Sequence, residues 1–113
     1  MKPLLESFPA DVQEFVKSVL KPATRGEPRG VEIALAEMSA TVLDRVEKDK
    51  LSPQKADDYF SFLYMFLDEK TDVDLSDAAQ DLLMEGMLFH DWGTPFAPDP
   101  SLMRELSGRI LKQ

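Results

Sequence analysis

The chain has 113 residues, of which 43% are hydrophobic and 30% charged, with a net charge of −8; this composition is typical of one soluble globular domain. No apolar run approaches the roughly 18 residues that a membrane-spanning helix needs, and an acid and two prolines within residues 1–9 leave no room for the apolar region of a signal peptide. Because Cys is also absent, we expect a cytoplasmic protein without disulfides or thiol chemistry.

The negative charge is concentrated in the second half of the chain. Residues 1–50 contain 8 bases and 9 acids, whereas residues 51–113 contain 5 bases and 12 acids. Such a surface repels phosphate backbones and anionic lipids, so we expect no direct binding to nucleic acid or to membranes. Two interpretations remain: a solvated acidic face that maintains solubility, or a docking face for a basic partner.

The first predicted helix begins near Pro9 and ends near Lys21. Pro9 suits the first turn, Asp11 complements the positive end of a helix, and apolar residues then recur at helical spacing through Leu20. Pro22 disfavours a helical conformation for the residue before it, which sets the predicted end.

Residues 21–30 contain two prolines and two glycines and are predicted to form a surface loop. The segment is basic but lacks the residue order of a P-loop.

A second helix is predicted from about Val31 to Asp49. Its apolar residues form two stripes on nearly opposite sides: Val31, Leu35, Met38, Val42 and Val46 on one, and Ile33, Ala36, Ala40 and Leu43 on the other. A helix of this kind is buried on two sides, and its small alanines allow close approach of another helix, from this chain or from a copy of it.

The most apolar stretch, 59–67, lies in a third predicted helix from about Pro53 to Lys70. Ser52 is the expected N-cap, and Pro53 suits the first helical position. Apolar residues cover more than half of the circumference, which implies burial on two sides, in a bundle or between two chains. Met65 falls among polar residues and is expected to be exposed. The aromatic candidates for the core or a dimer interface are Tyr59, Phe62, Tyr64 and Phe66.

A fourth helix is predicted from about Leu75 to Trp92. The acids before it resemble a calcium loop only superficially, because Asp77 occupies the position that requires Gly. Asp77, Asp81 and Glu85 follow at i, i+4 and i+8, an arrangement that is repulsive unless a positive group lies opposite. Together with Met65, these three acids form the predicted partner-binding face.

A proline-rich connection, 93–100, is predicted to cover the core, with Trp92 and Phe96 as anchors. Gly93 is placed to stop the fourth helix, and Pro95 prevents its resumption. Asp99 and Pro100 then open a last helix of about a dozen residues. Its apolar face contains Leu102, Met103, Leu106 and Ile110.

His90 is the only histidine. It could act as a general base oriented by a carboxylate, but Asp91 is poorly placed for this role because adjacent helical residues point about 100° apart. A hydrogen-bond donor or cation near a helix C-terminus is the simpler interpretation.

Metal chemistry has little support in the sequence. With one His and no Cys, one chain cannot build a structural zinc site. A carboxylate-only Mg or Ca site among Asp68, Glu69, Asp72 and Asp74 is the remaining alternative. We expect no metal and no cofactor, and no nucleophile motif identifies an enzyme.

These patterns predict an all-α, single-domain bundle of about five helices over residues 1–113. We expect it to act without catalysis, by protein–protein interaction, as a regulatory or accessory protein that forms a homodimer and binds a basic partner such as a toxin or nuclease that it neutralises. One alternative is a small-molecule binder or enzyme with a pocket between the fourth helix and the 93–100 loop, lined by His90, Trp92 and Phe96. Another is a subunit of a larger hetero-assembly.

Overall fold

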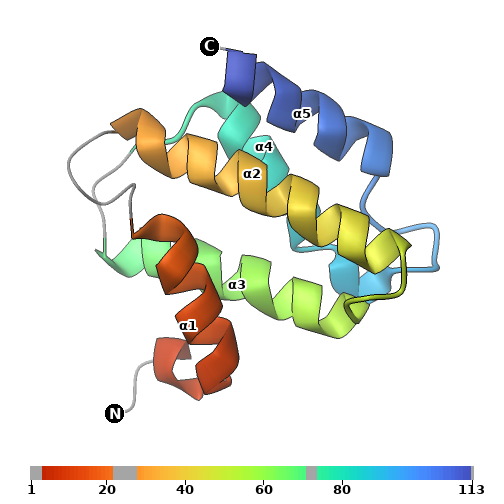
Figure 1. Cartoon of the computed structure of the whole chain (residues 1–113), viewed down its shortest axis with the longest axis horizontal. Coiled ribbons are helices and arrows are strands. Elements are labelled where there is room, and N and C mark those ends of the chain that lie inside the picture. Colours follow the sequence, from red (N-terminus) through yellow and green to blue (C-terminus); the bar gives the residue numbers. More distant parts are fainter. Residues whose placement is uncertain (1–3, 22–27, 71–73, 113) are drawn as a thin grey trace.

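The computed structural model describes residues 4–21, 28–70 and 74–112. These residues form five α-helices and two short 3-10 helices without any strand (Figure 1), so the prediction of an all-α bundle is confirmed. Within this part of the chain, no helix combines the length and apolar character needed to cross a membrane. The elements are η1 (Leu4–Ser7), α1 (Ala10–Leu20), α2 (Pro28–Glu47), α3 (Pro53–Lys70), α4 (Asp77–Gly86), η2 (Phe89–Asp91) and α5 (Pro100–Lys112).

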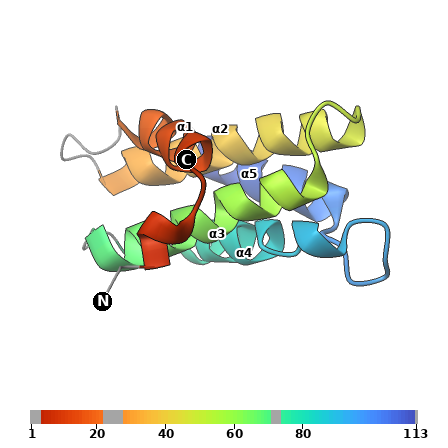
Figure 2. The same cartoon turned by 90° about the horizontal axis from the view of Figure 1, so that it is seen from below.

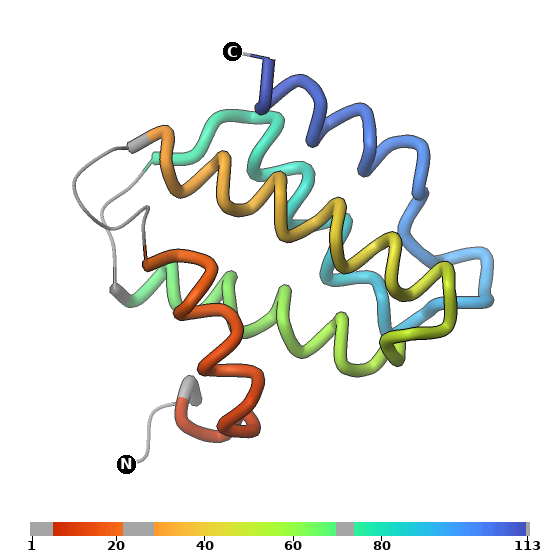
Figure 3. The backbone as a smooth tube through the Cα atoms, in the orientation of Figure 1, coloured from red at the N-terminus to blue at the C-terminus, as the bar shows by residue number. Residues whose placement is uncertain are grey.

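The helices pack in two layers, with α1 and α2 in one and α3 and α4 in the other (Figure 2). The shortest dimension of the molecule is 21 Å, which matches two layers of helices at the usual spacing. Helix α5 packs against both α2 and α4. Along the chain, α2 and α4 run in one direction and α3 and α5 in the other (Figure 3). The largest fully buried side chains are Phe60, Phe62, Phe89, Leu20, Leu35, Leu43, Leu63, Leu82, Met103 and Ile110.

Local capping signals place the starts of α3 and α5 where the sequence predicts them. The Ser52 hydroxyl accepts the Lys55 N–H at 3.1 Å and caps α3. The Asp99 carboxylate accepts the N–H groups of Ser101 at 2.9 Å and Leu102 at 3.3 Å and caps α5. Each cap satisfies backbone donors that the first helical turn leaves free.

Helix α2 begins at Pro28, inside the predicted 21–30 loop, and this part of the prediction is wrong. Proline is favoured at the first helical position, where its missing N–H costs nothing, so Pro28 starts the helix instead of extending the loop. The helix ends in a turn in which Asp49 has a φ of 56° and the Lys50 N–H bonds the Arg45 carbonyl at 2.8 Å. This is a Schellman-type ending with Asp in the position usually taken by Gly. Residues 22–27 lie outside the described part of the chain.

The fourth helix does not run to Trp92 as predicted. Helix α4 ends at Gly86, and the chain then winds more tightly through η2. The tighter winding stacks Phe89 on Phe60 and Trp92 on Phe89, each with ring centroids 5.7 Å apart. Tertiary packing of these rings therefore overrides the apolar pattern that predicts one continuous helix.

The aromatic side of α3 is covered within one chain. Phe15 of α1 stacks on Tyr59 with ring centroids 4.3 Å apart, and Phe8 meets Phe62 edge-on at 5.6 Å. Phe62 is buried, and Tyr59 and Phe66 are half-buried against the core. The apolar excess that led us to expect a homodimer is therefore mostly enclosed by the chain itself.

Two individual side chains on α3 differ in exposure. Tyr64 is 43% exposed and lies at the surface. Met65, expected to be exposed, is instead half-buried and packs against the core, so that expectation is wrong. Amphipathic spacing places Met65 on the polar arc, but the long flexible Met side chain can still reach apolar neighbours.

Candidate functional site

Helix α4 is held in a defined orientation by a polar contact at its N-terminus. Ser76 caps the helix by accepting the Ala79 N–H at 3.3 Å. The same hydroxyl donates to the buried Glu32 carboxylate of α2 at 2.6 Å. A carboxylate at this end also complements the positive pole of the α4 dipole. Sequence reasoning missed Glu32, because its partner lies 44 residues away.

This orientation determines which residues of α4 face outward. Ala79, Leu82, Leu83 and Gly86 are buried. The exposed residues lie on the opposite strip and include Asp77, Gln80, Asp81 and Met84. Met84, the one long apolar side chain among them, is 57% exposed.

Two of the three predicted binding acids are free to meet a partner. Asp77 and Asp81 are exposed, and neither forms an ion pair with a Lys or Arg of the described residues. Glu85 is half-buried, and its carboxylate accepts the Asp99 N–H at 2.8 Å. The structure thus brings Asp77, Asp81 and Met84 together as an exposed face, whereas Glu85 holds the segment before α5. We call Asp77, Asp81 and Met84 the α4 face.

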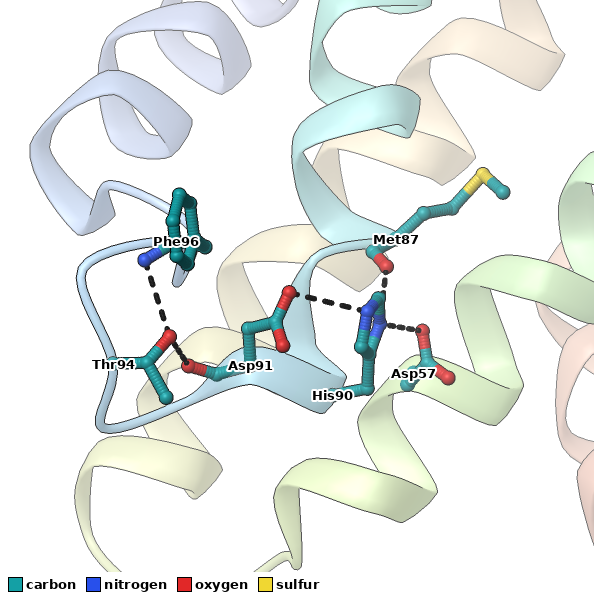
Figure 4. A network of polar contacts seen from close by, with 6 residues as sticks. All are labelled: Asp57, Met87, His90, Asp91, Thr94 and Phe96. Atoms are coloured by element: carbon teal, nitrogen blue, oxygen red, sulfur yellow. Dashed lines mark hydrogen bonds and ion pairs between the residues drawn. The ribbon is translucent and has the colours of Figure 1, made fainter.

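His90 lies at the centre of a second polar cluster, between η2 and α3 (Figure 4). Its Nδ1 is 3.0 Å from the Met87 carbonyl oxygen and 3.3 Å from Asp57 Oδ1. Its Nε2 is 3.2 Å from Asp91 Oδ2. Both ring nitrogens face acceptors, an arrangement that the doubly protonated imidazolium satisfies best.

Electrostatics around His90 follow this geometry. The hydrogen bond to Asp57 raises the pKa of His90 above its ordinary value, and the negative charge of Asp91 acts in the same direction. Burial raises the pKa of the Asp57 carboxyl, although His90 opposes that shift. His90 therefore acts as a clasp between η2 and α3, and both of its ring nitrogens already contact acceptors of the chain itself, which favour the cationic form of the ring.

The partners of His90 correct one expectation and confirm another. Asp91 was expected to be poorly placed, but the chain has left the α-helix by residue 90, and the 3-10 turn brings the Asp91 carboxylate to the ring. The bond to the Met87 carbonyl agrees with the predicted donor near a helix C-terminus. Asp57, 33 residues earlier, could not be identified from the sequence.

The residues of the predicted pocket lie in different surroundings. Trp92 is half-buried and stacks on Phe89, as expected of an anchor. Phe96 is 74% exposed, so the expectation that it anchors the loop on the core is wrong. Figure 4 shows Asp91 between Phe96 and His90.

Among residues 4–21, 28–70 and 74–112, no group of three or more His, Asp or Glu side chains is arranged to hold a metal ion. Asp72, one of the four carboxylates considered for a Mg or Ca site, lies outside these ranges.

In comparisons with known proteins, no family model, curated protein or solved structure matches the chain. The α4 face and the cluster around His90 are therefore the two candidate functional sites.

Proposed function

We propose that the protein acts by binding a basic protein through the α4 face. The observation that carries this proposal is the exposure of Met84 beside two acids that have no cation opposite them among the described residues. Met is a flexible, polarizable apolar residue that binding surfaces use often, because it adapts to the shape of a partner.

The charges on this face favour a partner of opposite sign. Asp77 and Asp81 are one turn apart and repel each other by a few tenths of a kcal/mol. A basic partner removes that repulsion on binding and is also steered toward the face during approach. Residues 71–103 contain seven acids and no Lys or Arg, so the same region repels nucleic acid and anionic lipid. A cytoplasmic regulatory or accessory role, including neutralisation of a basic toxin or nuclease, agrees with this chemistry.

The first experiment identifies the partner by photo-cross-linking in the cells that make the protein. A benzophenone amino acid replaces Met84 in one variant and Leu111, an apolar residue on α5 that is also exposed, in the control. We expect a discrete adduct of a basic protein from position 84 and none from position 111. An adduct of twice the chain mass would indicate a homodimer instead, and no adduct would contradict the proposal.

The second experiment measures the affinity of that partner for charge variants. Asp77→Lys with Asp81→Lys is expected to weaken binding about tenfold at low salt, because two attractions become repulsions. The difference should shrink as ionic strength rises. Glu14→Lys with Glu37→Lys changes the net charge equally at exposed positions on α1 and α2 and should have little effect. Equal weakening by both pairs would refute a specific role for the α4 face.

A further inference from the structure

Phe96 is the most exposed of the large apolar side chains in the described part of the chain. Its backbone is nevertheless held in place. The Thr94 hydroxyl donates to the Asp91 carbonyl at 2.7 Å and accepts the Phe96 N–H at 3.1 Å. The Ala97 N–H also bonds the Thr94 carbonyl at 3.2 Å. The ring thus projects into solvent from a turn with defined hydrogen bonds.

Both ends of this turn are attached to helices. At its far end, the Asp99 N–H bonds Glu85 of α4, and the Asp99 side chain caps α5. The backbone φ values of Pro95 and Pro98 are restricted by their rings, and Pro98 is buried. A segment constrained in this way loses little conformational freedom when it binds.

The near end of the turn is attached to α3 through the His90 cluster. Figure 4 shows a continuous set of contacts from Asp57 through His90 and Asp91 to Thr94 and Phe96. The carboxylate of Asp91 contacts His90, while its carbonyl accepts the Thr94 hydroxyl. The clasp around His90 therefore supports the turn that presents Phe96.

We propose that Phe96 is a preorganised anchor that enters an apolar pocket on the basic partner, with Lys or Arg at the rim of that pocket. An aromatic ring on a rigid support is the kind of residue that dominates binding energy at protein interfaces. Asp91 and Asp99 lie on either side of Phe96 in the chain; their carboxylates contact His90 and cap α5, and their negative charge also favours a basic rim. Glu85 links this turn to the helix that bears the α4 face. The inference rests on the proposed function and adds a second contact to it.

The test places the benzophenone amino acid at position 96, which keeps an aromatic side chain there, and compares it with position 64 on α3. Tyr64 is the matched control because it is also an exposed aromatic residue. We expect position 96 to cross-link the same protein as position 84, at residues that line an apolar pocket, and position 64 to give no adduct. An adduct with a second copy of this chain, or at a polar surface of the partner, would overturn the inference.

Affinity measurements with the identified partner separate the two proposals. Phe96→Ala is expected to weaken binding about thirty-fold at both low and high salt, because the lost contact is apolar. Thr94→Val keeps the side-chain shape but removes both hydroxyl hydrogen bonds, and it should weaken binding several-fold with Phe96 intact. Tyr64→Ala should leave affinity unchanged.

The pattern of losses distinguishes the possible failures. If the Asp77 and Asp81 charge reversal weakens binding but Phe96→Ala does not, the anchor is refuted and the proposed function stands. If position 84 and position 96 both give no adduct in cells, both proposals fail. A Thr94→Val protein that binds as tightly as the wild type would refute preorganisation as the reason for the Phe96 contribution.

Discussion

Replacement of Gly86 by Ala tests the packing between α3 and α4. A Cβ atom at position 86 would lie less than 3.0 Å from three ring atoms of Phe60, far inside normal carbon contact distances. Phe60 is fully buried and stacked on Phe89, so its ring has no free space to enter. Because Phe60 and Phe89 are both packed in the core, a methyl group at position 86 must either push α3 and α4 apart or force the Phe60 ring out of its rotamer.

The net effect is the difference of two terms. Overpacking of a core costs about 1–3 kcal/mol, and a clash with a fixed ring belongs at the upper end of that range. Ala is favoured over Gly in a helix by about 1 kcal/mol. We therefore expect Gly86→Ala to lower the free energy of unfolding by about 2 kcal/mol. With a urea m-value of about 1.5 kcal/mol/M, the unfolding midpoint falls by about 1.3 M.

Urea unfolding followed by Trp92 fluorescence and helical circular dichroism measures this loss. Gly108→Ala is the matched control, since a Cβ there meets nothing within 4 Å. It should raise stability by about 0.5 kcal/mol through helix propensity alone. Phe60→Leu should cost less in the Gly86→Ala background than in the wild type, because it makes room for the new methyl group. A Gly86→Ala protein as stable as the wild type would refute the account of α3–α4 packing.

Three further predictions concern buried or paired polar groups. Glu32→Ala removes the acceptor of the Ser76 hydroxyl and should lower the free energy of unfolding by about 1.5–3 kcal/mol. A double-mutant cycle with Ser76→Ala should give a coupling energy of about 1 kcal/mol between the two residues. Strictly additive losses would contradict the contact. Because the pKa of His90 is raised above 6.5, chiefly by Asp57, the stability it contributes is complete below pH 6.5 and is lost as pH rises through the raised pKa. When denaturation is measured from pH 6 to 9, the stability of the wild type should therefore fall relative to that of His90→Gln. Asp57→Asn should return the pKa of His90, measured by NMR, toward 6.5. Parallel pH profiles of the wild type and His90→Gln would disprove a stabilising contact between His90 and Asp57. Ser107→Ala should leave stability unchanged or raise it by up to about 1 kcal/mol, because the buried Ser107 hydroxyl has no hydrogen-bond partner among the described residues. A clear loss of stability in the same denaturation assay would show that the hydroxyl is paired.

Local sequence patterns are sufficient to predict the class of the fold and most helix starts. These features depend on residues within one or two turns of each other. Ser52 with Pro53 and Asp99 with Pro100 are local capping patterns, and both start helices where expected. Apolar periodicity likewise identified the buried residues of α1 and three of the four predicted on α5, because an amphipathic helix must turn its apolar side inward. The fourth, Leu102, is exposed, so that part of the prediction is wrong.

The end of α4 and the contacts of His90 depend instead on long-range packing. The sequence pattern predicts that Gly86 lies inside a long helix. In the structure, Gly86 is the last residue of α4 and the Phe60 ring packs against it. Asp57 and His90 are 33 residues apart, and their distance depends on how α3 packs on η2.

The exposure of Phe96 and Met84 also could not be predicted from the sequence. Phe96 was expected to anchor the 93–100 loop on the core, and Met84 has apolar residues directly before it in the chain. Contacts between distant segments determine how α4 and the segment before α5 are oriented, namely Ser76 with Glu32 and Asp99 with Glu85. Local patterns thus define which helices form, whereas long-range packing and hydrogen bonds decide which side chains remain available to a partner.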